Sequence, residues 1–225
     1  MTTFHVITLF PDAFESYLGV SIVKRAQERK LIAVRYYNPR DFAVGKFGRQ
    51  AKTYAERRVD DRPYGGGPGM VIEALPVIRA IEKAIGKKSQ KPKAKIIFFT
   101  PAGKQFANET ADSYMKYSDI VLICGRYEGI DARVKKVFPM AEISVGPFTV
   151  TGGELPAMII IDAVTRRIPG ALGHDQSVEE TRLASPDVYT RPEVFEYKKK
   201  KYRVPKILLS GHHAKMDEWK KERRR

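Results

Sequence analysis

Ile120-Val121-Leu122-Ile123-Cys124, followed at once by Gly125-Arg126-Tyr127-Glu128-Gly129, is the stretch that decides the fold. A short apolar, β-branched run bounded by a glycine turn predicts a strand. Similar runs occupy Phe4 to Phe10, Leu31 to Tyr37, Lys95 to Phe99 and Glu142 to Val145, with helix-like segments between several of them. This alternation predicts an α/β layered domain with a mostly parallel sheet.

Two segments have the periodicity of helices. Between Glu73 and Ile85, the apolar residues Leu75, Ile78, Ile81 and Ile85 fall three or four positions apart, which is typical of an amphipathic helix. The segment from Glu154 to Arg166 is apolar almost all round, so we expect a buried helix that could lie at a subunit interface.

Composition restricts the class of protein and its partners. The 225 residues suffice for one substantial domain, or for one domain with a small appendage. Lys and Arg total 41 against 26 acidic residues, a formal charge of +15, which favours nucleic acid over an acidic membrane surface. The sequence has no run of about 18 apolar residues that could span a bilayer, and its N-terminus, Met1 to His5, lacks the basic and apolar regions of a secretory signal, so we expect a cytoplasmic protein. The single cysteine, Cys124, is interpreted as a small core residue.

Changes in composition suggest three parts of the chain. We predict a catalytic domain over 1–170, a linker over 171–191 and a small, basic, helical domain over 192–225, which contains Lys198-Lys199-Lys200-Lys201. Within the first part, Arg40 to Arg62 is polar and weakly periodic, which indicates an excursion rather than a core element. The adjacent His212 and His213 lack a third ligand and predict no metal site.

Three glycine-containing loops are candidates for ligand binding: Asp60 to Met70, Gly125 to Asp131 and Thr149 to Pro156. None matches a phosphate-binding loop or a dinucleotide fingerprint. Glycines after strands let the backbone approach a flat ligand such as an adenine with its ribose, although each loop taken alone is also consistent with an ordinary tight turn.

Charged residues in these loops allow two interpretations each. Glu128 could face a cationic ligand or a base edge, or could be a surface carboxylate paired with Arg126 or Arg133. Asp60-Asp61-Arg62 could present carboxylates to a substrate base, or could form a turn with internal charge pairing.

The sequence resembles the bacterial tRNA (guanine-N1)-methyltransferases of the knotted SPOUT class. The resemblance extends over most of the chain and rests on ordered blocks: Leu9-Phe10-Pro11, Asn38 to Phe42, Val59 to Met70, Cys124 to Asp131, Leu155 to Met158, Ile161 to Val164, Ile168-Pro169-Gly170, Tyr189 to Val194 and Leu209 to His213. It implies a SPOUT-type α/β fold with a deep trefoil knot, which strand patterns alone do not predict.

The resemblance also implies an activity. It implies methyl transfer from S-adenosylmethionine to N1 of the guanosine at tRNA position 37, next to the anticodon, by a homodimer with its active sites at the interface. The implied donor pocket consists of Phe98, Phe99, Thr100, Pro101, Gly125, Tyr127, Glu128, Gly129, Ile130, Ser144, Val145, Gly146, Phe148, Val150, Thr151, Gly152 and Gly153.

Methylation at N1 needs two further groups. Guanine N1 carries a proton at neutral pH, so a general base must remove it, and a fixed cation near O6 would stabilise the charge that develops there. The family's arginine corresponds to Arg166, although Arg166 and Arg167 could instead only cap the end of a helix.

The family's catalytic aspartate has no counterpart here. Alignment on Glu179-Glu180 places Thr181 where the aspartate belongs, and threonine is not a base at neutral pH without help. Candidate replacements are Glu180, which we prefer, and Glu179, Asp187 or Asp60.

The chemistry leaves other functions open. One alternative is a related SPOUT enzyme that modifies another RNA, and another is a non-catalytic RNA-binding protein with a retired active site. The basic C-terminal segment fits tRNA phosphate binding, or could be a solvated tail. Assistance by Mg²⁺ stays open.

Overall fold

The computed structural model describes residues 1–43, 53, 55–86, 94–172 and 187–222. The chain is divided into two compact units, Met1–Leu172 and Gly173–Arg225. This division falls two positions beyond the predicted end of the first domain at residue 170. Most of the predicted linker lies outside the described residues.

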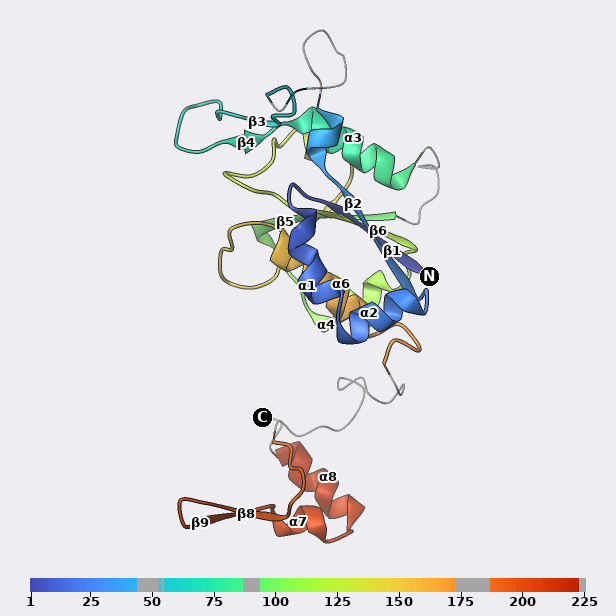
Figure 1. Cartoon of the computed structure of the whole chain (residues 1–225), viewed down its shortest axis with the longest axis vertical. Coiled ribbons are helices and arrows are strands. Elements are labelled where there is room, and N and C mark those ends of the chain that lie inside the picture. The colour runs from blue at the N-terminus through green and yellow to red at the C-terminus, as the bar shows by residue number, and fades with distance from the viewer. Residues whose placement is uncertain (44–52, 54, 87–93, 173–186, 223–225) are drawn as a thin grey trace. The chain divides into compact units, whose positions relative to one another are not determined.

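A five-stranded parallel sheet forms the centre of the first unit (Figure 1). Its strands are β1 (Thr2–Ile7), β2 (Ile32–Tyr37), β5 (Ala94–Gln105), β6 (Asp119–Ile123) and β7 (Ala141–Ser144), in the order β2-β1-β6-β5-β7. All neighbouring strands pair in parallel. The prediction of an α/β domain with a parallel sheet is therefore confirmed.

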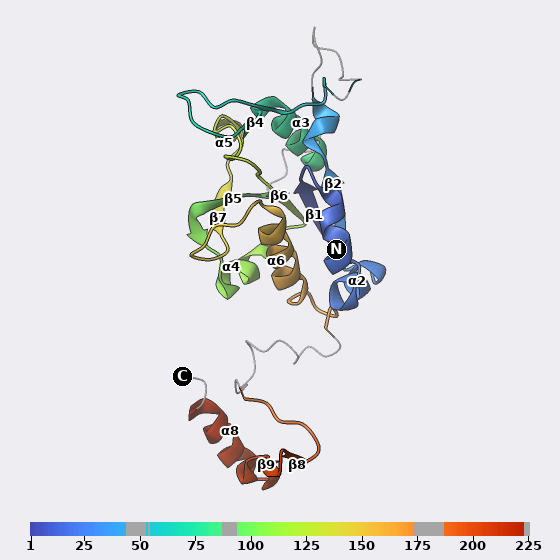
Figure 2. The same cartoon turned by 60° about the vertical axis from the view of Figure 1, so that its left-hand side comes forward.

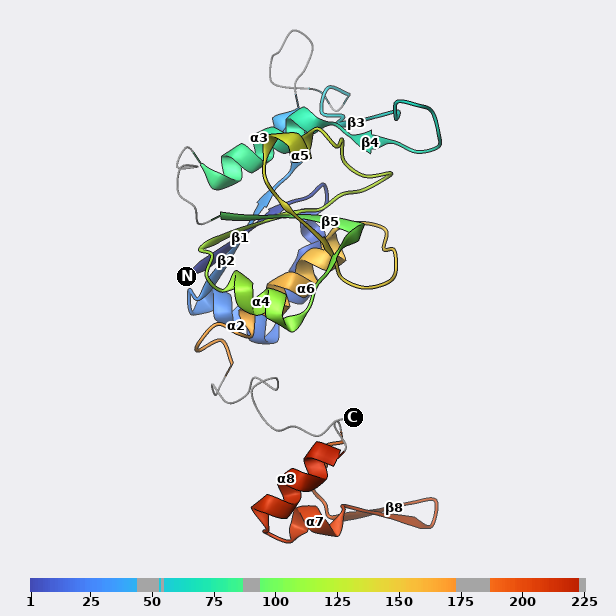
Figure 3. The same ribbon diagram turned by 180° about the vertical axis from the view of Figure 1, so that it is seen from behind.

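Helices cover both faces of this sheet, as Figures 1 and 3 show. One face packs against α1 (Glu15–Leu18), α2 (Ser21–Glu28), α4 (Asn108–Tyr114) and α6 (Glu154–Thr165), and the other against α3 (Ala74–Ile85) and α5 (Val134–Val137). Alternation along β6 explains the two cores, because Ile120 and Leu122 point into the first whereas Val121 and Ile123 point into the second. Figure 2 shows α6 lying along its face of the sheet.

The helix α3 begins and ends where its sequence allows. Pro76 lies in the first turn, where its missing N–H has no intrahelical partner to lose, and Gly86 follows the last turn with a φ of 68°. Its buried face is rotated from the predicted one: Val77, Ala80 and Ile81 are buried, whereas Leu75 is 47% exposed.

The segment between β2 and α3 contributes to the core, which the sequence did not predict. It contains 3-10 turns and short strands: Pro39–Phe42 follows β2 as Pro11–Phe14 follows β1, and β3 (Asp60–Asp61) pairs with β4 (Val71–Ile72). Ala43 and Val59 are 4% and 1% exposed and pack in the second core. The interpretation of Arg40 to Arg62 as a pure excursion is therefore wrong at these two positions, because the short run Phe42-Ala43-Val44 and the isolated Val59 are too brief to give a periodic signal.

The second unit consists of a hairpin and two helices. Strands β8 (Val194–Tyr197) and β9 (Lys200–Arg203) pair antiparallel, and α7 (Lys206–Leu209) and α8 (His213–Glu222) follow. The sequence predicted a helical unit and missed this hairpin. Across the described residues, no helix is both long and apolar enough to cross a membrane.

A buried histidine links three strands of the sheet. Its contact with Asp119 predicts that the stability of the fold depends on pH. His5, 2% exposed, contacts the Tyr37 hydroxyl through Nδ1 at 3.1 Å and Asp119 Oδ1 through Nε2 at 3.0 Å. Partial burial opposes ionisation of Asp119, but hydrogen bonds from His5 and Ser118 outweigh it, so the pKa of Asp119 lies below the usual 3.8. The carboxylate therefore stabilises the fold above pH 3.8 and ceases to do so as the pH falls through its lowered pKa.

We expect Asp119→Asn to lower the free energy of unfolding at pH 6 by less than about 1 kcal/mol, because the side chain is 43% exposed and screened by water. Urea titrations at pH 6 and pH 3 measure the effect. The difference from wild type should shrink at pH 3, and a constant difference would contradict the assigned role.

Candidate active site

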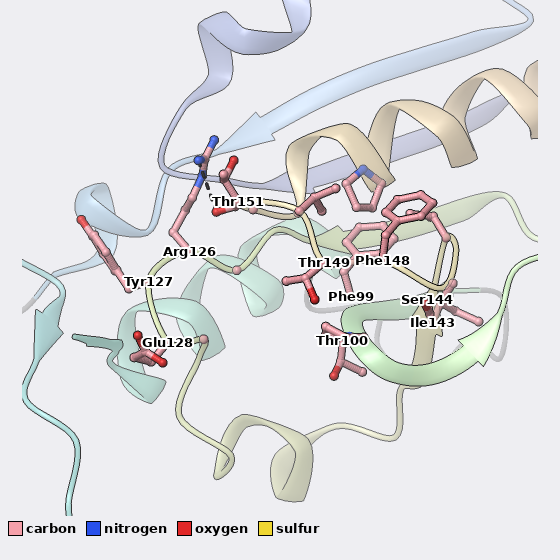
Figure 4. A pocket seen from close by; sticks show the side chains of 18 residues that line it. Phe99, Thr100, Arg126, Tyr127, Glu128, Ile143, Ser144, Phe148, Thr149 and Thr151 are labelled. Carbon is pink, nitrogen blue, oxygen red and sulfur yellow. Dashed lines mark hydrogen bonds between the residues drawn. The ribbon is translucent and has the colours of Figure 1, made fainter. Parts of the chain in front are cut away.

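The carboxyl ends of β6 and β7 and the middle of β5 surround one cavity (Figure 4). Its volume is about 310 Å³. Its walls come from the segments after β6 and β7, from the first residues of α6 and from the middle of β5: Phe99, Thr100, Pro101, Gly125, Arg126, Tyr127, Glu128, Gly129, Ile143, Ser144, Val145, Phe148, Thr149, Val150, Thr151, Gly152, Gly153 and Pro156. Ligands of parallel α/β sheets bind at this edge.

An irregularity in β5 opens one wall of this cavity. The pairing of β5 with β7 jumps from Phe99 opposite Ile143 to Lys104 opposite the same residue, so the intervening residues leave the ladder. Thr100 and Pro101, within this bulge, line the cavity. Gly103 returns the chain to the sheet, and any Cβ there would lie 2.6 Å from the Ile143 backbone nitrogen.

Tight crossing of two segments fixes the opposite wall. Gly153 donates its N–H to the Gly125 carbonyl at 3.0 Å, and a Cβ at Gly153 would lie 2.5 Å from the Cα of Cys124. Only glycine fits at position 153, because backbone atoms cannot yield. Cys124 itself is buried, as predicted, and burial raises the pKa of its thiol.

A buried ion pair supports the floor of the cavity. Glu154, 3% exposed, begins α6 and accepts a hydrogen bond from Thr8 Oγ1 at 2.7 Å. Its other carboxylate oxygen lies 2.9 Å from Arg126 Nε, but the N–H is poorly aligned, so this contact is mainly coulombic. Arg126 also stacks over the Phe10 ring at 4.8 Å and donates to the Thr151 carbonyl at 3.5 Å. These contacts fix the guanidinium beside the cavity.

Glu128 is not the paired surface carboxylate of the simpler interpretation. Arg126 pairs with Glu154, and Arg133 forms a bidentate pair with Asp131 that lowers the pKa of the Asp131 carboxyl. Among the described residues, Glu128 makes no side-chain hydrogen bond or ion pair. Figure 4 shows Glu128 and Tyr127 on one side of the cavity and Phe99 and Phe148 on the other. Glu128 is exposed, so water solvates its carboxylate here, and a cationic ligand group in the cavity could take the place of that water.

Most of the residues predicted to hold the methyl donor line this cavity. Phe98, Ile130 and Gly146 do not: Phe98 and Ile130, both 8% exposed, pack in the second core. Sequence reasoning missed Arg126, Ile143, Thr149 and Pro156, which line the cavity. Their position beside or within the predicted loops was the available signal.

Asp60 lies at a second cavity of about 510 Å³, lined also by Arg40, Ala55, Arg57, Arg58 and Tyr127. Tyr127 borders both cavities. Its backbone has a φ of 59°, in the left-handed region. Asp60 Oδ2 lies 3.5 Å from Arg58 Nη2, whereas Asp61 accepts the Arg62 N–H at 2.7 Å. The charge partner of Asp60 is therefore Arg58, outside the Asp60-Asp61-Arg62 block, and Asp61 accepts only a backbone N–H, so the charge pairing within the block that one interpretation proposed is not found among these contacts. Asp60 also lines a basic cavity. The pKa of the Glu73 carboxyl is raised, mainly by burial and to a smaller extent by the negative charges of Asp61 and Asp60.

The other predicted catalytic residues lie apart from both cavities or outside the described residues. Arg166 follows the last residue of α6, and its N–H donates to the Asp162 carbonyl at 3.0 Å. Glu180, Glu179 and Thr181 lie outside the described residues, and Asp187 is exposed. No group of three metal-binding side chains occurs within the described parts of the chain.

The fold and the cavity first define a class. A parallel sheet with helices on both faces, and glycine-lined loops around a cavity at its carboxyl edge, is the arrangement of an α/β ligand-binding protein. The model of the family described as tRNA (Guanine-1)-methyltransferase TrmD matches residues 2–225. The chain therefore belongs to this family, and the resemblance noted in the sequence is confirmed.

Individual relatives agree with the family model. A protein named tRNA (guanine-N(1)-)-methyltransferase from Clostridioides difficile (strain 630) is 42% identical over 223 residues, covering 97% of this chain and 90% of its own length. Proteins with the same name from Citrifermentans bemidjiense and Caldanaerobacter subterraneus are 43% and 46% identical, covering 97% and 98% of this chain and 83% and 86% of their own.

Proposed function

We propose that this chain transfers a methyl group from S-adenosylmethionine to N1 of the guanosine at position 37 of tRNA, next to the anticodon. The observation that carries the proposal is the glycine-lined cavity at the carboxyl edge of the sheet, with Glu128 free of any cation among the described residues, in a chain of this family.

The cavity suits the proposed donor. Its volume falls at the lower end of the range for small-molecule sites. Phe99, Ile143 and Phe148 offer apolar surface to an adenine, while a Cβ added at Gly129 would meet nothing within 4 Å, which leaves backbone open to a ligand. Glu128 supplies negative charge toward a sulfonium and Arg126 positive charge toward a carboxylate. The donor, when bound, supplies an electrophilic methyl group.

The helix α6 separates Arg166 from the cavity of its own chain. Glu154 begins α6 beside the cavity and Arg166 lies twelve positions further, about 18 Å along the axis at 1.5 Å per residue. Arg166 can stabilise charge on guanine O6 only if the base lies near that far end. Antiparallel packing of α6 on a second copy would bring the partner's Arg166 toward the cavity.

The exposed side of α6 supports such a homodimer. Leu155 and Ile159 lie one turn apart and are 57% and 43% exposed, and Phe148 nearby in sequence is 56% exposed. Large apolar side chains on one helical stripe are the expected centre of an isologous interface. The predicted burial of α6 all round would then be completed by the second copy.

The remaining parts of the proposal follow from the sequence. Glu180 is proposed as the base that removes the N1 proton, with Glu179, Asp187 and Asp60 as alternatives. A knotted path of the chain is part of the proposal, and the basic 192–225 domain, joined by the 171–191 linker, would contact tRNA phosphates. The protein would work in the cytoplasm, with or without Mg²⁺.

The test is methyl transfer from labelled S-adenosylmethionine to unmodified tRNA transcripts with guanosine or adenosine at position 37. We expect transfer only to the guanosine transcript, and loss of transfer with Glu180→Gln but not with the matched Glu193→Gln. Donor binding without transfer to either transcript would contradict the proposal and indicate another RNA substrate or a retired active site.

A further inference from the structure

The β8–β9 hairpin exposes nearly all of its side chains. From Phe195 to Arg203 every residue is exposed, and the strands extend beyond α7 and α8 (Figures 1 and 3). A two-stranded hairpin gains little stability from such a surface. Its composition is therefore informative about what it contacts.

One face of the hairpin is an aromatic platform. Phe195 lies opposite Tyr202 and Tyr197 opposite Lys200, so strand alternation places these four side chains on the same face. The rings of Phe195 and Tyr202 stack with centroids 5.2 Å apart and planes 13° from parallel. Phe195, Tyr197 and Tyr202 are 55%, 58% and 41% exposed, so all three side chains of this platform are accessible to a ligand.

The tip of the hairpin concentrates positive charge. Lys198 and Lys199 form the two-residue turn with φ values of 49° and 62°, positions that favour Asn and Gly over long side chains. Lysines occupy this turn although Asn-Gly would relieve its strain. Lys198 and Lys200 place their ammonium groups 5.4 Å and 5.5 Å from the Tyr197 and Tyr202 ring centroids.

We propose that this hairpin binds RNA by stacking unpaired bases on the Phe195, Tyr197 and Tyr202 platform while the tip lysines contact neighbouring phosphates. Aromatic rings interleaved with cations are the combination that single-stranded nucleic acid requires. A lipid surface fits less well, because the aromatic face carries no aliphatic side chain and Val194 lies on the opposite face. The choice of RNA rests on the proposed function.

Two variants separate stacking from charge. Phe195→Thr with Tyr202→Thr removes the stacked rings and retains β-branched strand residues, whereas Lys198→Asn with Lys199→Gly removes two charges and retains a favoured turn. The probes are an RNA stem with an unpaired loop, a fully paired RNA duplex and vesicles of anionic phospholipid. Binding of the full-length protein is measured over a range of salt concentrations.

We expect the aromatic variant to bind the stem-loop about ten-fold more weakly and the duplex within about two-fold of wild type. The lysine variant should lower the salt slope on the stem-loop by about 0.7 for each phosphate that the hairpin no longer neutralises. Glu196→Gln, on the opposite face, is the matched control and should not weaken binding. Unchanged stem-loop binding, an equal loss on the duplex, or a defect confined to vesicles would overturn the proposal.

Methyl transfer by the wild type is measured separately. Absence of transfer together with weaker binding by the aromatic variant would contradict the enzymatic function and leave the hairpin assignment intact. Normal transfer with unchanged binding would overturn the hairpin assignment alone.

Discussion

Replacing Arg166 by alanine is expected to lower single-turnover methyl transfer to the guanosine-37 transcript by about 100-fold to 1,000-fold, the usual effect of removing one group that stabilises developing negative charge. Affinity for the methyl donor should change little, because Arg166 does not line the cavity of its own chain. The measurement is the transfer rate at saturating enzyme, with donor affinity determined by calorimetry.

The neighbouring arginine is the matched control. The Arg167 side chain is 5% exposed and donates to Asp112 Oδ1 at 2.7 Å and to Asn108 Oδ1 at 2.6 Å, which ties the segment just after α6 to α4. Arg167→Ala should lower the melting temperature and leave the transfer rate near wild type at temperatures where the variant is folded. Equal transfer rates in wild type and Arg166→Ala would contradict the catalytic assignment and favour a helix-capping role.

The second large effect is on stability. Glu154→Ala removes the carboxylate shared by Arg126 and Thr8 and leaves the guanidinium partly buried without its counterion. Breaking a buried pair from one side costs about 3–5 kcal/mol, which corresponds to a melting temperature lower by about 10 °C for a domain of this size. Thermal and urea unfolding of the variant measure this cost.

An exposed pair of the same kind provides the comparison. Glu142 Oε2 lies 2.8 Å from Lys135 Nζ, but the glutamate side chain is 44% exposed. Glu142→Ala should therefore cost less than about 1 kcal/mol. If Glu154→Ala costs no more than Glu142→Ala, the ion pair at the start of α6 does not support the cavity.

Donor binding tests the same network. Because Arg126 and Glu154 set the position of the loops at the cavity floor, Glu154→Ala should also weaken binding of S-adenosylmethionine at temperatures where the variant is folded. The paired variant Glu154→Leu with Arg126→Leu should recover much of the stability, since no unpaired charge remains, but not the donor affinity. Recovery of both the stability and the donor affinity would show that the Arg126–Glu154 pair does not support the donor site.

Apolar patterns and glycine positions in the sequence were by themselves enough to predict the strands of the sheet and the loops at the cavity. The apolar runs predicted all five strands of the central sheet, and the glycine loops after them predicted most of the residues that line the cavity. These features are local: a strand needs a few consecutive apolar residues, and a loop that approaches a ligand needs glycine wherever a Cβ would collide.

Only the tertiary structure decided which charged groups meet. Glu154 and Arg126 are 28 positions apart, and Thr8 is 146 positions from Glu154, so no spacing rule predicts their contact. Arg133 and Asp131 are only two positions apart, but the sequence also allowed Arg133 to pair with Glu128, and the structure pairs Arg133 with Asp131. The sequence also did not predict the aromatic face of the hairpin. A run of lysines has no hydrophobic periodicity, and only the antiparallel pairing of the strands places Tyr197 and Tyr202 beside Phe195. Local sequence determines backbone conformation, whereas partners for long side chains depend on how distant segments cross in the folded chain.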